Sequence, residues 1–278
     1  LERQLNDARK IQIVPSHHTS HSATMHLPTL ASLTAGFRAT LMRFPLPALF
    51  AAIVSGLFVW SVEAGWDDNQ LLRFVLLGGL GFIASLLGEL ITEATQSGYR
   101  QRLTTQVGVL LLLLLYSSFI MPEQLDDARP PFAYSYFILL FALHLGIALV
   151  PALARSGPDR LWRFNLSCFL RYFFSTVNAA LLFCGLALAL LSIDKLFEIG
   201  LYEEIYLQLW VLCAFFAHPV LFLGGLPRLN EPEDRRAFPK PLRFSLCFIG
   251  LPLVVLYLLI LYAYLAKIIL QWSWPNGW

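Results

Sequence analysis

Residues 109–155 read VLLLLLLYSSFIMPEQLDDARPPFAYSYFILLFALHLGIALVPALAR, and this stretch decides the fold class. It holds two continuously apolar runs, which are separated by an acidic gap and followed by a basic residue. A helix needs about 20 mostly apolar residues to cross the roughly 30 Å of hydrocarbon in a bilayer. The spans that contain these runs, residues 104–121 and 132–153, are about that long. The runs do not alternate every second residue as membrane barrel strands do. The stretch therefore predicts two membrane-spanning helices.

Further stretches follow the same pattern, and together they predict an all-α, polytopic membrane helix bundle. Hydrophobic residues make up 57% of the chain and charged residues 14%, whereas soluble domains carry about 25% charged residues. A water-soluble core of this length could not bury so many apolar runs. Seven spans are predicted, over residues 45–65, 71–92, 104–121, 132–153, 170–193, 205–226 and 244–272.

The charges in the gaps alternate in sign, and this alternation orients the predicted bundle. Lys and Arg accumulate in the short cytoplasmic loops of membrane proteins. Basic gaps, such as the one with Arg100 and Arg102, alternate with acidic gaps, such as the one with Asp126 and Asp127. We therefore expect a cytoplasmic amino terminus and a carboxyl terminus outside. The net charge of +2 and the scatter of the basic residues argue against nucleic acid as a partner. The expected partner is the lipid bilayer.

The chain divides into a polar tail, residues 1–42, and the helix bundle, residues 43–278. The tail lacks helical periodicity, and we expect it to be disordered. It contains a cluster of four histidines: His17, His18, His21 and His26. A metal-binding tail would also explain them, but no carboxylate or cysteine shares their spacing. No metal or other cofactor is predicted. The four cysteines lie in or beside apolar runs, where they behave as small hydrophobes.

Five polar residues are predicted at bilayer depth, and they form the candidate site. They are Glu89, His144, Arg171, Asn178 and His218. Ionisable side chains at that depth usually face the bundle interior or a water-filled cavity. At about 1.5 Å per residue, His144 lies about 16 Å and His218 about 13 Å from the basic side. Such an imidazole could relay protons or bind a metal; an interhelical hydrogen bond is the favoured interpretation.

Glu89 and Arg171 are expected to form an ion pair. Glu89 shares one helix face with Gly78 and Gly81, which favour close approach of a second helix, so this face should point inward. Arg171 and Asn178 share one side of their helix at a depth compatible with Glu89. A pair with Asn178 beside it would offset the cost of burying either charge. It would either fix the helix register or serve as a transport or catalytic site.

Pro219 directly follows His218 and should interrupt the sixth predicted span. Proline has no N–H, so the carbonyl one turn earlier is freed for water, an ion or a side chain. Such kinks occur in transporters and in inert bundles alike.

Three stretches carry a resemblance to a known family. They are WRFN at 162–165, IDKLF at 193–197, and the run 252–268 followed by WPNG at 274–277. Together they resemble domain of unknown function family 4153, from about Arg43 to the end of the chain, and the last motif is the most specific. The resemblance implies a bacterial inner-membrane protein and transfers no reaction or catalytic residue. Family members continue with further spans, so we expect the front portion of a longer protein.

Three classes of function remain open. The favoured one is a non-enzymatic membrane module: a scaffold, or the anchor or sensor portion of a larger envelope protein. Its partner would be a membrane or envelope protein, or the carboxyl-terminal continuation of the same protein. The second class is a transporter or channel for an ion, small solute or lipid, lined by the five candidate residues. The third is an intramembrane enzyme on a lipid-linked substrate, for which no HExxH, GxSxG or Walker motif is present.

Overall fold

The computed structural model describes residues 30–64, 69–122, 130–154, 158–229 and 249–271. All regular elements in these ranges are helical, and seven helices are long and apolar enough to cross a membrane. The predicted all-α bundle with seven spans is confirmed. The helices are α2 (Leu30–Arg43), α3 (Pro45–Ala64), α4 (Asn69–Ala94), α5 (Tyr99–Phe119), α6 (Pro130–Leu153), α7 (Pro158–Phe197), α8 (Glu204–Leu212), the π-helical turn η1 (Cys213–Ala217), α9 (His218–Gly225) and α11 (Leu251–Gln271).

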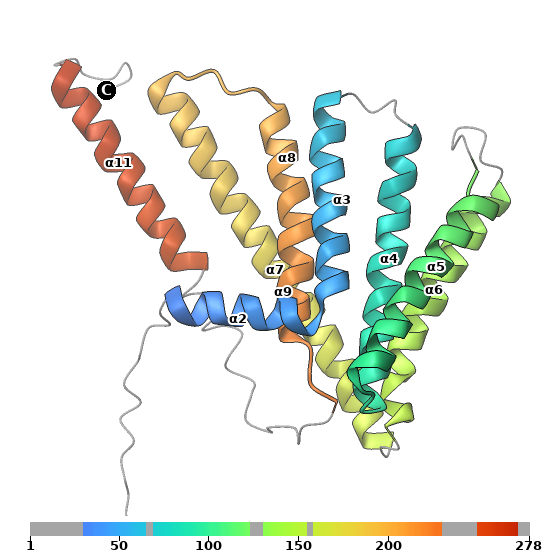
Figure 1. Cartoon of the computed structure of the whole chain (residues 1–278). Coiled ribbons are helices and arrows are strands. Elements are labelled where there is room, and N and C mark those ends of the chain that lie inside the picture. The colour runs from blue at the N-terminus through green and yellow to red at the C-terminus, as the bar shows by residue number, and fades with distance from the viewer. Residues whose placement is uncertain (1–29, 65–68, 123–129, 155–157, 230–248, 272–278) are drawn as a thin grey trace, which may run out of the picture.

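The spanning helices converge at one end of the molecule and spread apart toward the other (Figure 1). We call the converging end, which holds Arg43, Arg100 and Arg102, the basic end. The opposite end holds Glu203 and Glu204, and we call it the acidic end. Helix α4 packs against α3, α5 and α6, whereas α7 packs against α6, α9 and α11. Helix α3 joins the two groups because it contacts α4 on one side and α8 and η1 on the other.

The largest apolar core lies at the basic end, where these helices meet. Phe44, just before α3, is completely buried in it, as are Leu90 of α4 and Leu223 of α9. Farther from this end many large apolar side chains point outward, for example Leu112 and Phe141, which are 66% and 69% exposed. Outward apolar surface of this kind suits contact with lipid, because hydrocarbon solvates apolar side chains while every backbone polar group is satisfied inside its helix.

The disordered tail predicted for residues 1–42 is wrong for residues 30–42, which belong to α2. This helix lies across the basic end (Figure 1) and packs against α3 and α9. Phe37, Leu41 and Phe44 follow the spacing i, i+4, i+7, which gives one apolar stripe along a helix. Leu41 and Phe44 reach the core at the basic end. Residues 1–29, with the four histidines, lie outside the described residues.

Two spanning helices begin earlier than the sequence predicted. Helix α5 begins at Tyr99, not at residue 104, and α7 runs from Pro158 to Phe197, not from 170 to 193. Its 40 residues correspond to about 60 Å, about twice the hydrocarbon thickness. It therefore crosses the molecule obliquely, from beside α6 at the basic end toward α11 (Figure 1). The seventh predicted span is described only over residues 249–271, which include α11, because residues 244–248 and 272 lie outside the described ranges.

The inward face predicted for α4 is confirmed. Its members are all buried: Gly78, Gly81, Ser85, Glu89 and Thr92. A Cβ atom on Gly81 would overlap the ring of Phe50, and a Cβ atom on Gly78 would overlap the side chain of Val54. Both neighbours belong to α3, so the glycines permit close packing of α3 on α4.

Candidate functional site

Glu89 is paired with Arg102 of the neighbouring helix α5. The Glu89 side chain is 4% exposed, and its Oε2 accepts a hydrogen bond from Arg102 Nε at 2.5 Å. Arg102 also donates from Nη2 to the backbone oxygen of Arg43 at 2.6 Å. The second carboxylate oxygen, Oε1, is buried without a hydrogen-bond partner among the described residues. One guanidinium thus joins α4, α5 and the end of α2.

The predicted ion pair between Glu89 and Arg171 is therefore wrong. The two residues lie at similar depth, but Glu89 contacts Arg102 of α5 whereas Arg171 contacts α9. Arg171 extends along Gly225 at the end of α9. Asn178 is 5% exposed and donates from Nδ2 to the Phe174 oxygen of its own helix at 2.7 Å. Asn178 therefore makes no hydrogen bond with Glu89. Two residues at equal depth meet only if their helices are neighbours.

A second ion pair, Arg43 with Glu93, lies beside the first. Arg43 Nη2 donates to both carboxylate oxygens of Glu93 at 3.0 Å, and Nε donates to Oε2 at 3.2 Å. The same guanidinium donates to the backbone oxygens of Leu226 at 2.7 Å and Pro227 at 2.9 Å. Glu93 Oε1 also accepts from the backbone N–H of Leu229 at 3.0 Å. This pair fastens α4 to the segment that follows α9.

We call Arg43, Glu89, Glu93 and Arg102 the basic-end network. The last carbonyls of a helix have no donor within the helix and carry partial negative charge. Arg102 donates to such a carbonyl at the end of α2, and Arg43 donates to two just beyond α9. Each carboxylate then neutralises one guanidinium. The network therefore satisfies backbone carbonyls and charges together, at the place where most of the helices converge.

The two intramembrane histidines lie apart from this network and from each other. His144 is exposed on α6, and its Nδ1 is 2.7 Å from the Leu140 oxygen of the same helix. His218 begins α9, and its Nε2 is 3.1 Å from Thr176 Oγ1 of α7. His218 thus makes the interhelical hydrogen bond predicted for both, whereas His144 bonds within its own helix. The described residues contain no group of three or more His, Cys, Asp and Glu side chains that could hold a metal ion.

Pro219 interrupts the sixth span, as predicted, and the interruption takes the form of a π-helical turn. The His218 N–H donates to the Cys213 oxygen, five residues back. The Ala214 carbonyl thereby loses its usual donor, and the Phe215 carbonyl loses its own because proline has no N–H. Turns of this kind occur frequently at functional sites.

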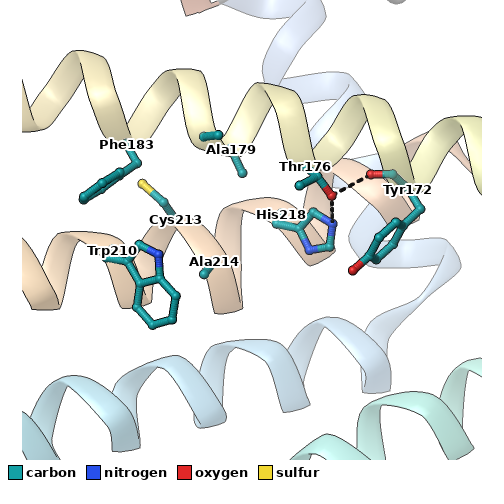
Figure 2. A pocket seen from close by; sticks show the side chains of 9 residues that line it. Tyr172, Thr176, Ala179, Phe183, Trp210, Cys213, Ala214 and His218 are labelled. Carbon is teal, nitrogen blue, oxygen red and sulfur yellow. Dashed lines mark hydrogen bonds between the residues drawn. The ribbon is translucent and has the colours of Figure 1, made fainter.

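A cavity of about 340 Å³ lies between this turn and α7 (Figure 2). Most of its wall is apolar, and His218 and Thr176 supply polar atoms. Its lining residues are Tyr172, Thr176, Ala179, Ala180, Phe183, Trp210, Cys213, Ala214 and His218. Sequence reasoning singled out His218 and Pro219 but missed Tyr172 and Thr176, because nothing in a sequence tells which residue of another helix faces a kink.

The stretches that carry the family resemblance lie at two helix joints. Lys267 Nζ of α11 donates to the Leu196 oxygen at 2.8 Å and lies 5.6 Å from the ring centre of Phe197. This contact satisfies a carbonyl at the end of α7. At the other end of α7, Asn165 Nδ2 donates to the Ala148 oxygen of α6 at 3.0 Å. These residues of the motifs therefore hydrogen-bond α7 to α6 at one end and to α11 at the other.

The model of the family described as Domain of unknown function (DUF4153) matches residues 48–278. The chain belongs to this family. A curated relative, Uncharacterized protein PM1469 of Pasteurella multocida (strain Pm70), is 26% identical over 238 residues. The match covers 84% of this chain and 38% of the relative. This DUF4153 chain therefore spans well under half the length of that relative. No solved structure matches the chain.

Proposed function

We propose that this DUF4153 chain is a non-enzymatic membrane module, the anchor or scaffold portion of a larger protein of the bacterial inner membrane. The observation that carries the proposal is the basic-end network. Its four charged side chains bind one another, the backbone carbonyl at the end of α2 and a backbone carbonyl just beyond α9. Charges used in this way hold helices in a fixed arrangement, which is what a module that supports other parts of a protein requires.

The alternative, a transporter or channel, would need its polar residues along one path. Three of the candidates lie apart instead: Glu89 at the basic end, His144 exposed on α6, and His218 at the cavity beside η1. This distribution favours the module.

The proposal is tested by flux measurements on the full-length protein. We expect proteoliposomes to pass protons, Na⁺ and K⁺ no faster than protein-free liposomes, since the Glu89 carboxylate is held by Arg102. Ion-sensitive dyes trapped inside the vesicles measure the flux. A wild-type flux that Glu89→Gln abolishes would overturn the module in favour of transport. Glu203→Gln, the same substitution at an exposed carboxylate of the acidic end, serves as the matched control.

The second part of the proposal is the orientation, with the basic end in the cytoplasm. Tyr99 at the basic end and Tyr202 at the acidic end are 77% and 82% exposed. After the four native cysteines are replaced with alanine, we expect Tyr202→Cys to react with a membrane-impermeant maleimide in intact spheroplasts. Tyr99→Cys should react only after permeabilisation. The reverse pattern would place the basic end outside the cell.

A further inference from the structure

The geometry around Thr176 fixes the hydrogen-bonding roles of the His218 ring. A threonine hydroxyl has one hydrogen to donate. Thr176 Oγ1 donates this hydrogen to the backbone oxygen of Tyr172 at 2.9 Å. The hydroxyl therefore accepts from His218, whose Nε2 is 3.1 Å away. Nε2 therefore carries a proton. Figure 2 draws both bonds, and the other ring nitrogen, Nδ1, lies farther from Thr176.

Nδ1 is left as an acceptor on the wall of the cavity. In neutral imidazole one nitrogen donates and the other accepts. Within the described residues Nδ1 has no hydrogen-bond donor, while His218 lines the cavity. The wall around this nitrogen is mostly apolar, although it also carries the Tyr172 and Thr176 hydroxyl groups (Figure 2). A molecule that brings its own O–H or N–H would satisfy the accepting nitrogen, because an unsatisfied polar group in mostly apolar surroundings costs free energy.

Among the described residues, the cavity opens to the outer surface of the bundle. Thr176 and Ala180 are exposed, and Tyr172 and Trp210 are 55% and 46% exposed. His218 lies about 13 Å from the end of its span, so the opening faces the hydrocarbon region. A molecule that enters from there must itself be soluble in the bilayer. The volume of about 340 Å³ lies within the range of small-molecule sites.

We propose that this cavity binds a hydroxyl-bearing lipid, a long-chain alcohol in chemical class, whose O–H donates to His218 Nδ1 and whose chain lies along Ala179, Phe183 and Trp210. Edge-on contact between Tyr172 and His218, with ring centres 5.0 Å apart, holds the imidazole in place. The π-helical turn contributes Cys213 and Ala214 to the wall of this space. The binding site stands independently of the scaffold role, because none of its residues belongs to the basic-end network.

The proposal is tested by photolabelling of the full-length protein in nanodiscs. The probes are a hexadecanol that carries a diazirine and an alkyne, and its methyl ether, which lacks the O–H donor. We expect the alcohol to label peptides from residues 172–183 and 210–218 at a roughly three- to tenfold lower concentration than the ether, the effect of one hydrogen bond. Equal labelling by the two probes would overturn the proposal.

Two substitutions locate the bound probe. Ala180→Phe fills the cavity from its exposed rim and should reduce labelling of these peptides to background. Val177→Phe, on the same helix and 48% exposed but outside the lining, should leave labelling unchanged. His218→Phe should remove the preference for the alcohol over the ether. Undiminished labelling in Ala180→Phe, or a preference retained in His218→Phe, would mean that the probe only contacts the outer surface.

Discussion

Replacement of Arg102 by methionine is expected to lower the free energy of unfolding by about 3–5 kcal/mol, the usual cost of leaving a buried charge without its partner. Glu89 is 4% exposed, and Arg102 Nε is its ion-pair partner at 2.5 Å. Methionine keeps the apolar stem of arginine but brings no donor. The Glu89 carboxylate and the Arg43 carbonyl would both lose their hydrogen bonds to Arg102. Steric trapping in bicelles measures this free energy within a membrane-like environment.

Arg100→Met is the matched control for this experiment. Arg100 precedes Arg102 by two residues and is exposed on the same first turn of α5, so we expect a change below about 0.5 kcal/mol. The double variant Arg102→Met, Glu89→Gln leaves no uncompensated charge and should recover most of the loss. Equal losses in Arg100→Met and Arg102→Met would contradict the assignment of the pair, as would a double variant no more stable than Arg102→Met.

The spans themselves were predictable because the bilayer imposes them. A continuous run of about 20 apolar residues has few alternatives to a transmembrane helix. The charges between the runs indicate where the spans end. For α5 and α7, however, they predicted a helix start that is too late. Arg100 and Arg160 lie in first turns of α5 and α7, not in loops. For α7 the sequence held a signal in Pro158 and Asp159, since proline and an acidic residue both favour a helix start.

The partner of Glu89 could not be found from depth alone. Depth along a span follows from counting residues, but contact also requires that two helices be neighbours. The stronger signal was the short connection at residues 95–98 between α4 and α5. Helices joined by a short loop lie antiparallel and adjacent, so residues at similar distances from the loop come together. Glu89 and Arg102 meet that condition.

The cavity at η1 shows a different limit of prediction. Pro219 predicted an interrupted helix, and the structure confirms it. A proline can leave a helix kinked or can be accommodated by a π-helical turn. Which of these forms depends on the packing against α7. Thr176 contacts His218 because α7 packs against α9 there. Single-sequence patterns describe one helix at a time, so they contain no information about this crossing.

Arg43→Met is expected to cost about 3 kcal/mol of unfolding free energy, because one substitution removes an ion pair and the donors to two carbonyls. Arg43 and Glu93 are both 20% exposed, so water screens this pair more than it screens Glu89. Arg43→Lys should lower the free energy of unfolding by about half as much as Arg43→Met. An ammonium group lacks the planar, branched donors with which arginine reaches Glu93, Leu226 and Pro227 together. Steric trapping again gives the free energies, and Arg38→Met, exposed on the same helix, is the control.

Glu93→Gln separates the two roles of Arg43. An amide oxygen in place of the carboxylate can still accept from Arg43, and the bonds to the Leu226 and Pro227 oxygens remain possible. If the bonds to the two backbone carbonyls dominate, Glu93→Gln should cost less than half as much as Arg43→Met. If the ion pair dominates, the two losses should be similar, because the Arg43 charge would then lack its counter-charge. We expect the first result, since Arg43 makes its shortest hydrogen bond, 2.7 Å, with the Leu226 carbonyl and not with Glu93.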